Sequence, residues 1–391
     1  MRQIYDVLII GAGAAGLFCA GEAVARGLRV LVLEHGVQPG RKILISGGGR
    51  CNFTNLDVSA RNFISQNPHF CKSALAGFTP QAFLALVTRA GTAWHEKTAG
   101  QLFCDDSASQ ILRLLLERAD KAALRCGVAV TAVTHAGEFH VETSHGPFLA
   151  RNLVVATGGL SIPKIGASDF AYRLARQFGH AVVTPRPALV PLLFAGQETG
   201  WMQTLAGVSA PVVARKGKIS FKENLLFTHR GLSGPAILQI SSYLQPGEAV
   251  TVDFAPGIRL AEALRAAKHT HPKAGLKTAL SAHLPARLAA HFAAKIPGNL
   301  ADLPDKTLRA LGDELNAHTF TPTGTEGFAK AEVTAGGVDT AGLHSRDCSS
   351  ASLPGLFFIG EAVDVTGWLG GYNFQWGWAS AHAAAKGLLG S

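Results

Sequence analysis

The sequence contains few charged residues and no long apolar run. Charged side chains make up 16% of its 391 residues, against 47% for apolar ones. A chain of this balance can bury a large core, so we expect a folded protein rather than a disordered one. No apolar stretch reaches the roughly 20 residues that a membrane span needs, and the first residues lack the pattern of a secretory signal. We therefore expect a cytoplasmic protein that contacts no membrane.

Cysteine is also sparse and follows no motif. The six cysteines form no C-x-x-C pair, which argues against a disulfide framework, a zinc site or a dithiol redox centre. We accordingly expect no bound metal. The cysteines are Cys19, Cys51, Cys71, Cys104, Cys126 and Cys348.

Acidic residues are almost missing from one segment of the chain. Residues 257–298 contain seven lysines or arginines, four histidines and a single acid, Glu262, in a chain of formal net charge +9. One interpretation is a solvated helical face that improves solubility. The other is a surface for a polyanion such as RNA. Charge alone leaves both interpretations open.

Glycine, by contrast, is abundant, with 44 residues, and its first cluster is the most informative motif. Residues 11–16 read Gly-Ala-Gly-Ala-Ala-Gly and follow an apolar segment, residues 5–10, that predicts a strand. In a strand, turn and helix of this kind, Gly11 allows the turn and Gly13 lets the backbone approach a pyrophosphate. Gly16 lets the helix pack closely on the sheet. The phosphates would meet the free N–H groups at the start of the helix.

A second predicted strand, residues 28–33, ends at Glu34. The carboxylate of Glu34 is placed to accept hydrogen bonds from a ribose, and its charge disfavours a 2′-phosphate there. Strand, motif and acid together predict a dinucleotide other than NADP at this site.

Three further glycine-rich segments favour FAD over NAD. Residues 40–52 carry consecutive glycines and two arginines, which suit a loop around phosphates and the flavin edge. Residues 156–159 end a continuous apolar strand, where the chain must pass close to the ligand. In residues 360–375, Asp364 can hold a ribityl chain, and glycine N–H groups before a helix can face the flavin edge that becomes negative on reduction.

These segments, with His35 and Val133, supply the predicted cofactor-binding set. We expect Tyr372 and Asn373 to hold the isoalloxazine ring. The full set is Gly11, Gly13, Ala14, Ala15, Gly16, Glu34, His35, Arg41, Lys42, Ser46, Gly47, Gly48, Arg50, Cys51, Asn52, Val133, Ala156, Thr157, Gly158, Gly159, Gly360, Glu361, Asp364, Gly370, Gly371, Tyr372, Asn373 and Gln375.

The order of these patterns predicts an α/β fold in which both ends of the chain build one Rossmann-like domain. Short apolar runs bounded by proline and glycine begin near residue 187, and a buried-strand pattern returns at residues 356–360. We assign residues 1–186 and 327–391 to a discontinuous FAD-binding domain, 187–256 to a β-rich insertion and 257–326 to a basic helical insertion. We also expect helices at 80–90, 107–126 and 379–389, strands at 128–133, 139–143 and 152–157, and a loop at 38–55.

Several segments resemble the YhiN/BaiN-type bacterial flavoproteins, FAD-dependent oxidoreductases of the two-dinucleotide-binding-domain class. The most specific matches are Ser-Gly-Gly-Gly-Arg-Cys-Asn at 46–52 and Thr-His-Arg-Gly-Leu-Ser-Gly-Pro at 228–235. Further matches at 11–16, 156–159, 335–338 and 360–375 extend the resemblance over almost the whole chain. It implies an FAD-binding Rossmann-like domain interrupted by a β-barrel-like piece and a helical piece. It also implies double-bond reduction, of uridine in ribosomal RNA or of enone intermediates of bile acids.

The chain carries one dinucleotide fingerprint and no paired cysteines, so a separate NAD(P)H domain is not expected. We expect NAD(P)H to visit transiently and to pass a hydride to FAD, which then reduces an activated carbon–carbon double bond. A ribosomal RNA substrate would suit the basic insertion, because phosphates supply non-specific affinity. Two alternatives stay open: a flavin reductase or oxidase acting on an enone or bile-acid-like small molecule, and a non-catalytic FAD-containing RNA-binding protein.

Three residues are candidates for the catalytic proton donor. Cys51 lies beside the glycine-rich loop, although a buried packing cysteine is the alternative. His229 and Arg230 lie in the family-specific segment of the insertion, and histidine suits acid catalysis near neutral pH. A polar turn before a helix at Pro235 would use the same residue types.

Overall fold

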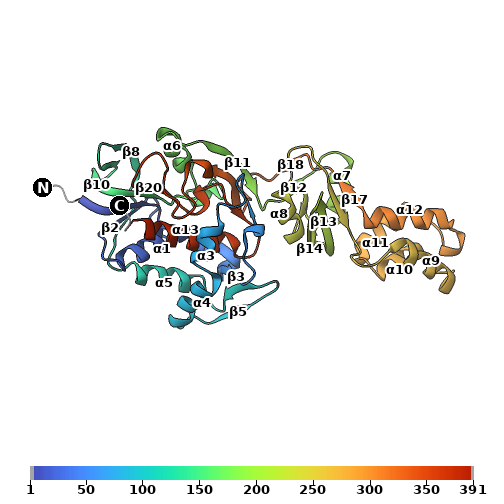
Figure 1. Cartoon of the computed structure of the whole chain (residues 1–391). Helices are drawn as coiled ribbons and strands as arrows, with labels where there is room; N and C mark the ends of the chain where they lie inside the picture. The colour runs from blue at the N-terminus through green and yellow to red at the C-terminus, as the bar shows by residue number, and fades with distance from the viewer. Residues whose placement is uncertain (1–3, 389–391) are drawn as a thin grey trace. The chain divides into compact units, whose positions relative to one another are not determined.

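The computed structural model describes residues 4–388, apart from the side chains of residues 197 and 198. The chain forms two compact units. Met1–Arg186 and Val333–Ser391 make up the first unit, and Pro187–Glu332 make up the inserted unit. The chain thus returns to the first unit a few residues after position 327, where the sequence places the return. The blue and red ends of the chain lie in the same unit in Figure 1.

A mixed seven-stranded sheet forms the centre of the first unit. Its strands are β1 (Ile4–Ile10), β2 (Val30–Glu34), β7 (Ala123–Cys126), β8 (Val130–His135), β9 (Phe139–Thr143), β10 (Phe148–Val155) and β20 (Leu356–Phe358). The strand order is β7-β2-β1-β10-β9-β8, and β20 pairs with the second half of β10. The strands β7, β2, β1, β10 and β20 run parallel, whereas β8 and β9 form an antiparallel hairpin.

The strand register aligns the carboxyl ends of the parallel strands. Ile10 of β1 pairs with Leu33 of β2 and with Val155 of β10. Val155 in turn pairs with Phe358 of β20. The residues that follow these four positions therefore leave the sheet at one edge, which is the edge where open α/β sheets bind ligands.

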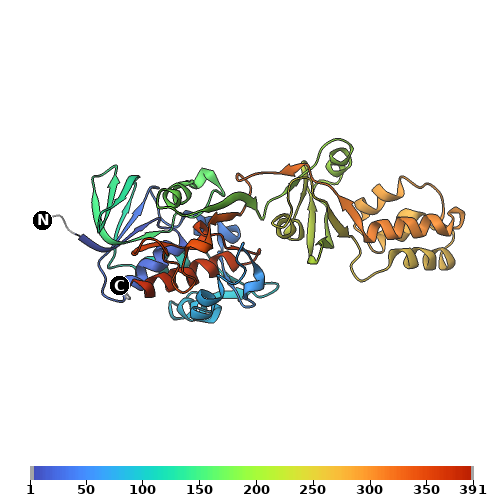
Figure 2. The ribbon, with the colours of Figure 1, turned by 45° about the horizontal axis from the view of Figure 1, so that its top comes forward.

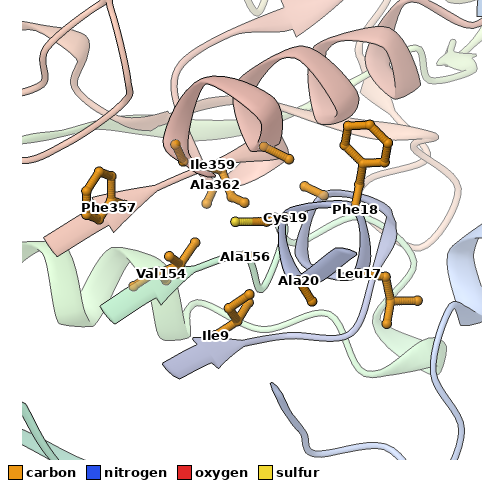
Figure 3. Packing of buried hydrophobic residues seen from close by; sticks show 14 of the residues in the cluster. Ile9, Leu17, Phe18, Cys19, Ala20, Val154, Ala156, Phe357, Ile359 and Ala362 are labelled. Atoms are coloured by element: carbon orange, nitrogen blue, oxygen red, sulfur yellow. The ribbon is translucent and has the colours of Figure 1, made fainter. Parts of the chain in front are cut away.

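Two helices rich in alanine and glycine, α1 (Ala14–Val24) and α13 (Tyr372–Gly387), pack against each other and are buried on nearly all sides. Small side chains let their backbones approach closely. α13 begins well before the predicted start at 379, because the aromatic segment after Gly371 continues the buried helix. Figure 3 shows the layer between the helices and the sheet, with Ile9, Val154, Ala156 and Phe357 near Leu17, Phe18, Cys19, Ala20, Ile359 and Ala362.

The helix predicted at 107–126 is wrong in its second half. Ser109–Arg118 form α5, whose apolar side packs on α1, but Ala123–Cys126 form β7. Hydrogen bonds to β2 override local helix propensity in β7, because tertiary pairing outweighs so weak a preference.

The loop predicted at 38–55 is also partly wrong. It contains α2 (Arg41–Ile45) and β3 (Asn52–Asn55). The strand β3 forms by pairing with β6 (Gln101–Cys104), whose other neighbour is β5 (Trp94–Glu96). No local sequence pattern predicts this small sheet, because β3 is distant in sequence from β5 and β6.

The remaining elements of the first unit are short. They include β11 and β19, which pair with each other, so the chain leaves and re-enters the unit on neighbouring strands. The elements are α3 (Lys72–Gly77), α4 (Pro80–Arg89), α6 (Phe170–Gln177), β4 (Phe63–Ile64), β11 (Val182–Ala188), β19 (Val333–Val338) and β21 (Thr366–Gly367).

The inserted unit contains a barrel-like antiparallel sheet. Its strands are β12 (Leu192–Leu193), β13 (Ser209–Lys216), β14 (Ile219–Phe227), β15 (Gly231–Ser233), β16 (Val250–Asp253), β17 (His318–Phe320) and β18 (Gly324–Thr325), in the order β17-β16-β13-β14-β15-β12-β18. β17 and β18 lie at opposite ends of this order, yet only residues 321–323 join them. The four Cα–Cα steps from Phe320 to Gly324 span at most about 14 Å, so the sheet must curl until its edges approach.

Helices follow and flank this sheet. Prolines at 272, 285 and 297 lie between the helices of the basic segment, as the sequence predicts. In Figure 2 these gold-to-orange helices form a bundle beside the sheet. The helices of the inserted unit are α7 (Gln197–Thr204), α8 (Pro235–Ser241), α9 (Leu260–Thr270), α10 (Leu276–Ser281), α11 (Ala286–Ala293) and α12 (Asp305–Asn316).

Candidate functional site

The first glycine motif occupies the turn between β1 and α1. Gly11 has φ +107°, and a Cβ there would stand 2.5 Å from the carbonyl oxygen of Ala156. A Cβ at Gly16 would collide with the carbonyl oxygen of Gly11. A Cβ at Gly13, by contrast, would meet nothing within 4 Å. Close packing of the chain thus requires glycine at positions 11 and 16. Gly13 instead faces open space beside the N–H groups of the first turn of α1, which have no partner within the helix.

Glu34 holds this turn in place. Its carboxylate accepts hydrogen bonds from the backbone N–H groups of Ala12 (2.9 Å) and Gly36 (2.8 Å) and lies 3.2 Å from Nδ1 of His35. Each carboxylate oxygen has a second lone pair. Glu34 can therefore accept hydrogen bonds from a ribose while it fixes the motif.

A polar cluster joins the segments that follow β10 and β20. Lys42 Nζ lies 2.6 Å from Glu361 Oε2 and donates to Ser161 Oγ at 2.6 Å. Glu361 Oε1 accepts from Ser161 Oγ and from the N–H of Thr334, both at 2.9 Å. Lys42 and Glu361 belong to the predicted cofactor set, whereas Ser161 and Thr334 do not. The Gly-Gly-Leu-Ser sequence after β10 was the signal available for Ser161.

The glycine loop of residues 46–49 adopts a left-handed backbone, with φ of +57°, +66° and +85° at its three glycines. A Cβ at Gly48 would face open space. Ser46 uses its hydroxyl to hold the carbonyl oxygen of Ile43 at 2.7 Å. Arg41 and Arg50 flank the loop, and in the described part of the chain neither has an acidic partner, so both are available to a phosphate.

Cys51 follows this loop but has no exposed surface. Burial raises the pKa of its thiol to about 12, although a hydrogen bond with Ser46 opposes the effect. The sequence leaves open whether Cys51 packs in the core or donates a proton. Its buried position favours packing.

The carboxyl-terminal glycine cluster packs against β3. A Cβ at Gly371, where φ is +93°, would collide with the carbonyl oxygen of Thr54. Asn52 Oδ1 accepts from the N–H of Gly371 at 3.2 Å in the amide orientation that satisfies both of its polar atoms. Asn55 donates to the carbonyl oxygen of Gly370 at 2.9 Å. The turn before α13 is therefore fixed by contacts with residues some 300 positions earlier.

Two predicted cofactor ligands in this cluster have their polar atoms bound within the protein. Asn373 exchanges hydrogen bonds with the backbone of Gly367 at 2.8 and 2.9 Å. Gln375 is fully buried, accepts from Thr54 Oγ1 at 2.6 Å and donates to the carbonyl oxygen of Phe78 at 2.8 Å. Asn373 thus fixes the backbone at Gly367, and Gln375 links α13 to Thr54 and Phe78.

The remaining predicted positions on this side are Gly360, Asp364 and Tyr372. Gly360 lies against the first turn of α1, where a Cβ would stand 3.0 Å from that of Ala15. Asp364 is buried and accepts from the N–H of Gln66 at 2.8 Å, and burial raises the pKa of its carboxyl group. Burial likewise raises the pKa of Tyr372 to about 12.

Val133 lies on β8, away from these turns. In the sheet order, β9 separates β8 from β10, and the carbonyl oxygen of Val133 accepts from Gln177 Nε2 at 2.6 Å. The tryptophans of α13 serve the core, since Nε1 of Trp376 donates to the carbonyl oxygen of Gly360 (2.9 Å) and Nε1 of Trp378 to that of Phe53 (2.8 Å).

Two buried polar atoms near this edge show that the site fits a polar ligand. Thr157 Oγ1, directly after β10, and the hydroxyl of Tyr172 on α6 are buried and have no hydrogen-bond partner among residues 4–388. Such orphaned groups cost free energy unless a ligand or water satisfies them. Gly158, with φ +73°, faces open space beside Thr157. Burial raises the pKa of the Tyr172 phenol, and the carboxylates of Glu361 and Asp364 raise it further. No sequence pattern pointed to Tyr172.

His229 and Arg230 lie in the inserted unit, in the turn between β14 and β15. Both are exposed. Thr228 Oγ1 accepts from the N–H groups of Arg230 and Gly231, and the Arg230 guanidinium lies 3.9 Å from Glu326. Their catalytic role remains a prediction.

The described residues show neither a membrane-spanning helix nor a metal centre. Among residues 4–388, no helix is long and apolar enough to cross a bilayer. Nor do histidine, cysteine and acidic side chains gather in threes as ligands for a metal ion in that range.

A Rossmann-type sheet whose parallel strands end at one edge is typical of a dinucleotide-binding domain, and similarity to known proteins assigns this one to the FAD-dependent oxidoreductases. Residues 5–387 match the family described as HI0933-like protein Rossmann domain. The chain belongs to that family, as its resemblance to known flavoproteins predicts.

Characterised relatives align with nearly the whole chain. A protein named ribosomal RNA dihydrouridine synthase from Escherichia coli (strain K12) is 49% identical over 98% of both chains. Its namesake from Haemophilus influenzae is 47% identical, again over 98% of both. A 3-dehydro-bile acid delta(4,6)-reductase from Clostridium scindens is 31% identical over 97% of both.

Proposed function

We propose that this protein reduces the carbon–carbon double bond of a uridine in ribosomal RNA to give dihydrouridine. The observation that carries this proposal is the 49% identity, over 98% of both chains, to a protein named for that reaction. The bile-acid reductase is also similar from end to end, but at 31%. A polyanionic RNA substrate also suits the basic helices of the inserted unit, whereas a bile acid carries a single carboxylate and would not need so many positive charges.

FAD, when bound and reduced by its electron donor, would supply the hydride for the carbon being reduced. In this proposal the N–H groups at the start of α1 and the open side of Gly13 hold its pyrophosphate. Arg41 and Arg50 offset the phosphate charge, and Glu34 accepts hydrogen bonds from a ribose. NAD(P)H is the proposed electron donor, visiting transiently because the sequence carries a single dinucleotide fingerprint.

Some basic side chains of residues 257–298 already have partners within the inserted unit, which leaves fewer of them available to bind RNA phosphates. Arg265 and Lys268 both pair with Asp305, at 3.2 and 3.0 Å. Arg287 donates to backbone carbonyl oxygens within its own unit. Lys273 and Lys277, on the α9–α10 connection and on α10, are exposed and have no acidic partner among the described residues. We propose that these two lysines contribute to the RNA-binding surface.

Nucleoside mass spectrometry of ribosomal RNA from a deletion strain tests the proposed substrate. We expect one dihydrouridine to disappear and to return when the wild-type gene is supplied on a plasmid. An unchanged dihydrouridine content would refute the proposal. Anaerobic turnover of an enone by the purified protein would then direct attention to small molecules.

A further inference from the structure

The hairpin of β5 and β6 borders the glycine loop of the cofactor cradle. Phe103 of β6 lies against Gly47, because a Cβ on that glycine would stand 2.9 Å from Phe103 Cε1. The residue after Phe103, Cys104, donates its N–H to the carbonyl oxygen of Arg50 at 3.0 Å. At the start of β6, Gln101 packs against Gly370, where a Cβ would stand 3.0 Å from Gln101 Cδ. The hairpin therefore contacts both glycine clusters that the sequence assigns to the flavin.

His95 of β5 lies on the face of this hairpin that Phe103 occupies. The two residues are direct partners in the strand register, and their rings stack with centroids 6.0 Å apart and planes 14° apart. Phe103 thus contacts both His95 and Gly47. The side chain of His95 is 42% exposed, so a bound substrate can reach it.

Asp105 fixes the orientation of this histidine. Its carboxylate Oδ1 lies 2.6 Å from His95 Nδ1. In the part of the chain that the structure describes, Nε2 has no hydrogen-bond partner. A carboxylate that holds one ring nitrogen leaves the other free to transfer a proton, which is the arrangement of an oriented general acid. Lys97 also lies near this ring, with its ammonium 5.4 Å from the Phe103 ring centroid.

We infer that His95, positioned by Asp105, donates the proton in the double-bond reduction, and this inference rests on the proposed function. A hydride supplied by the reduced cofactor adds to one carbon of the double bond, and the π electrons form a C–H bond at the other carbon with the proton from Nε2. Two C–H bonds form, one π bond is broken, and neutral His95 regains a proton from water. Cys51 is fully buried, whereas His95 is both accessible and adjacent to the cradle.

Anaerobic half-reactions of the holoenzyme test this inference. Chemically reduced wild type, His95→Gln and Asp105→Asn are mixed with ribosomal RNA from the deletion strain, and flavin reoxidation near 450 nm and dihydrouridine are measured. We expect His95→Gln to slow both by about 100-fold or more, and Asp105→Asn to slow them less.

Two controls separate chemistry from structure. Oxidation by ferricyanide requires no proton at carbon, so all variants should react with it at the wild-type rate. His145→Gln changes another exposed histidine of the first unit, one whose hydrogen bond is to Ser144, and should behave as wild type. The inference about His95 would be overturned, with the proposed function intact, by either of two results. In one, His95→Gln reduces RNA at the wild-type rate; in the other, its reaction with ferricyanide slows as much as its reaction with RNA. A wild type that RNA cannot oxidise would overturn the proposed function, and the role of His95 with it.

Discussion

Tyr172 is the residue near the cofactor cradle that stands out most clearly without being predicted by any sequence motif. It is 1% exposed, and its hydroxyl has no hydrogen-bond partner in the described part of the chain. The carboxylates of Glu361 and Asp364 raise its pKa further than burial alone. A buried phenol hydroxyl without a hydrogen bond lowers the stability of the fold, because its desolvation costs roughly 1–3 kcal/mol. A bound ligand that accepts or donates a hydrogen bond there would recover that cost.

Tyr172→Phe should therefore separate cofactor binding from folding. We expect FAD affinity to fall by roughly 5- to 150-fold, the equivalent of about 1–3 kcal/mol, while the cofactor-free protein unfolds at the same or a higher temperature. Fluorescence titration with FAD and thermal unfolding of the apoprotein measure the two effects. Loss of stability without loss of affinity would assign Tyr172 to packing.

Glu22 illustrates a buried charge that is fully paired. It lies on α1 and is held by Arg26 (3.1 Å), Arg118 of α5 (2.7 Å) and His382 of α13 (2.8 Å). Burial alone would raise the pKa of its carboxyl group, but hydrogen bonds from His382 and Arg26 outweigh burial and lower it to about 2. Glu22 therefore stabilises the fold above its unfolded pKa, near 4.5, and this stabilisation is lost as pH falls toward 2.

Glu22→Gln should consequently destabilise the protein in a pH-dependent way. We expect the free energy of unfolding to drop by on the order of 1–3 kcal/mol at pH 7, with the difference from wild type shrinking below about pH 4. Urea unfolding at pH 7 and near pH 3.5 provides the comparison. An equal difference at both pH values would show that weaker packing, rather than charge, is responsible.

Among the secondary-structure elements, the sequence predicts those whose cause is local. Apolar runs predict β1, β2 and β10, and prolines predict the breaks between the basic helices. The sequence does not predict β7 and β3, because each forms only by pairing with a strand that is distant in sequence. The same limit applies to the site: glycine motifs mark the cradle, whereas Tyr172 and Thr334 reach it only through tertiary packing.

Element α10 and its connection to α9 carry the prediction about RNA. Reversing charge in a Lys273→Glu, Lys277→Glu double variant should weaken RNA binding and flatten the slope of log affinity against log salt by roughly 0.7–0.9 for each phosphate that the protein no longer neutralises. Arg265→Gln is the matched control, because Asp305 already offsets that charge. Filter binding at several salt concentrations measures the slope. Equal slopes in the double variant and wild type would exclude this surface.

For the whole molecule, two compact units imply that cofactor binding stabilises only part of the chain. FAD at 100 times its dissociation constant would add about 2.7 kcal/mol to the unit that binds it. We expect FAD removal to lower the temperature of one calorimetric transition and to leave that of the inserted unit unchanged. A uniform shift of a single transition would mean that the units unfold together.

The paired strands β11 and β19 carry the chain out of the first unit and back into it. Since exit and return lie side by side, the parent domain could acquire or lose the whole module during evolution without rearranging its own sheet. Homologues that differ greatly in this module could therefore share an unchanged nucleotide cradle and change substrates by exchanging what is grafted between these two strands.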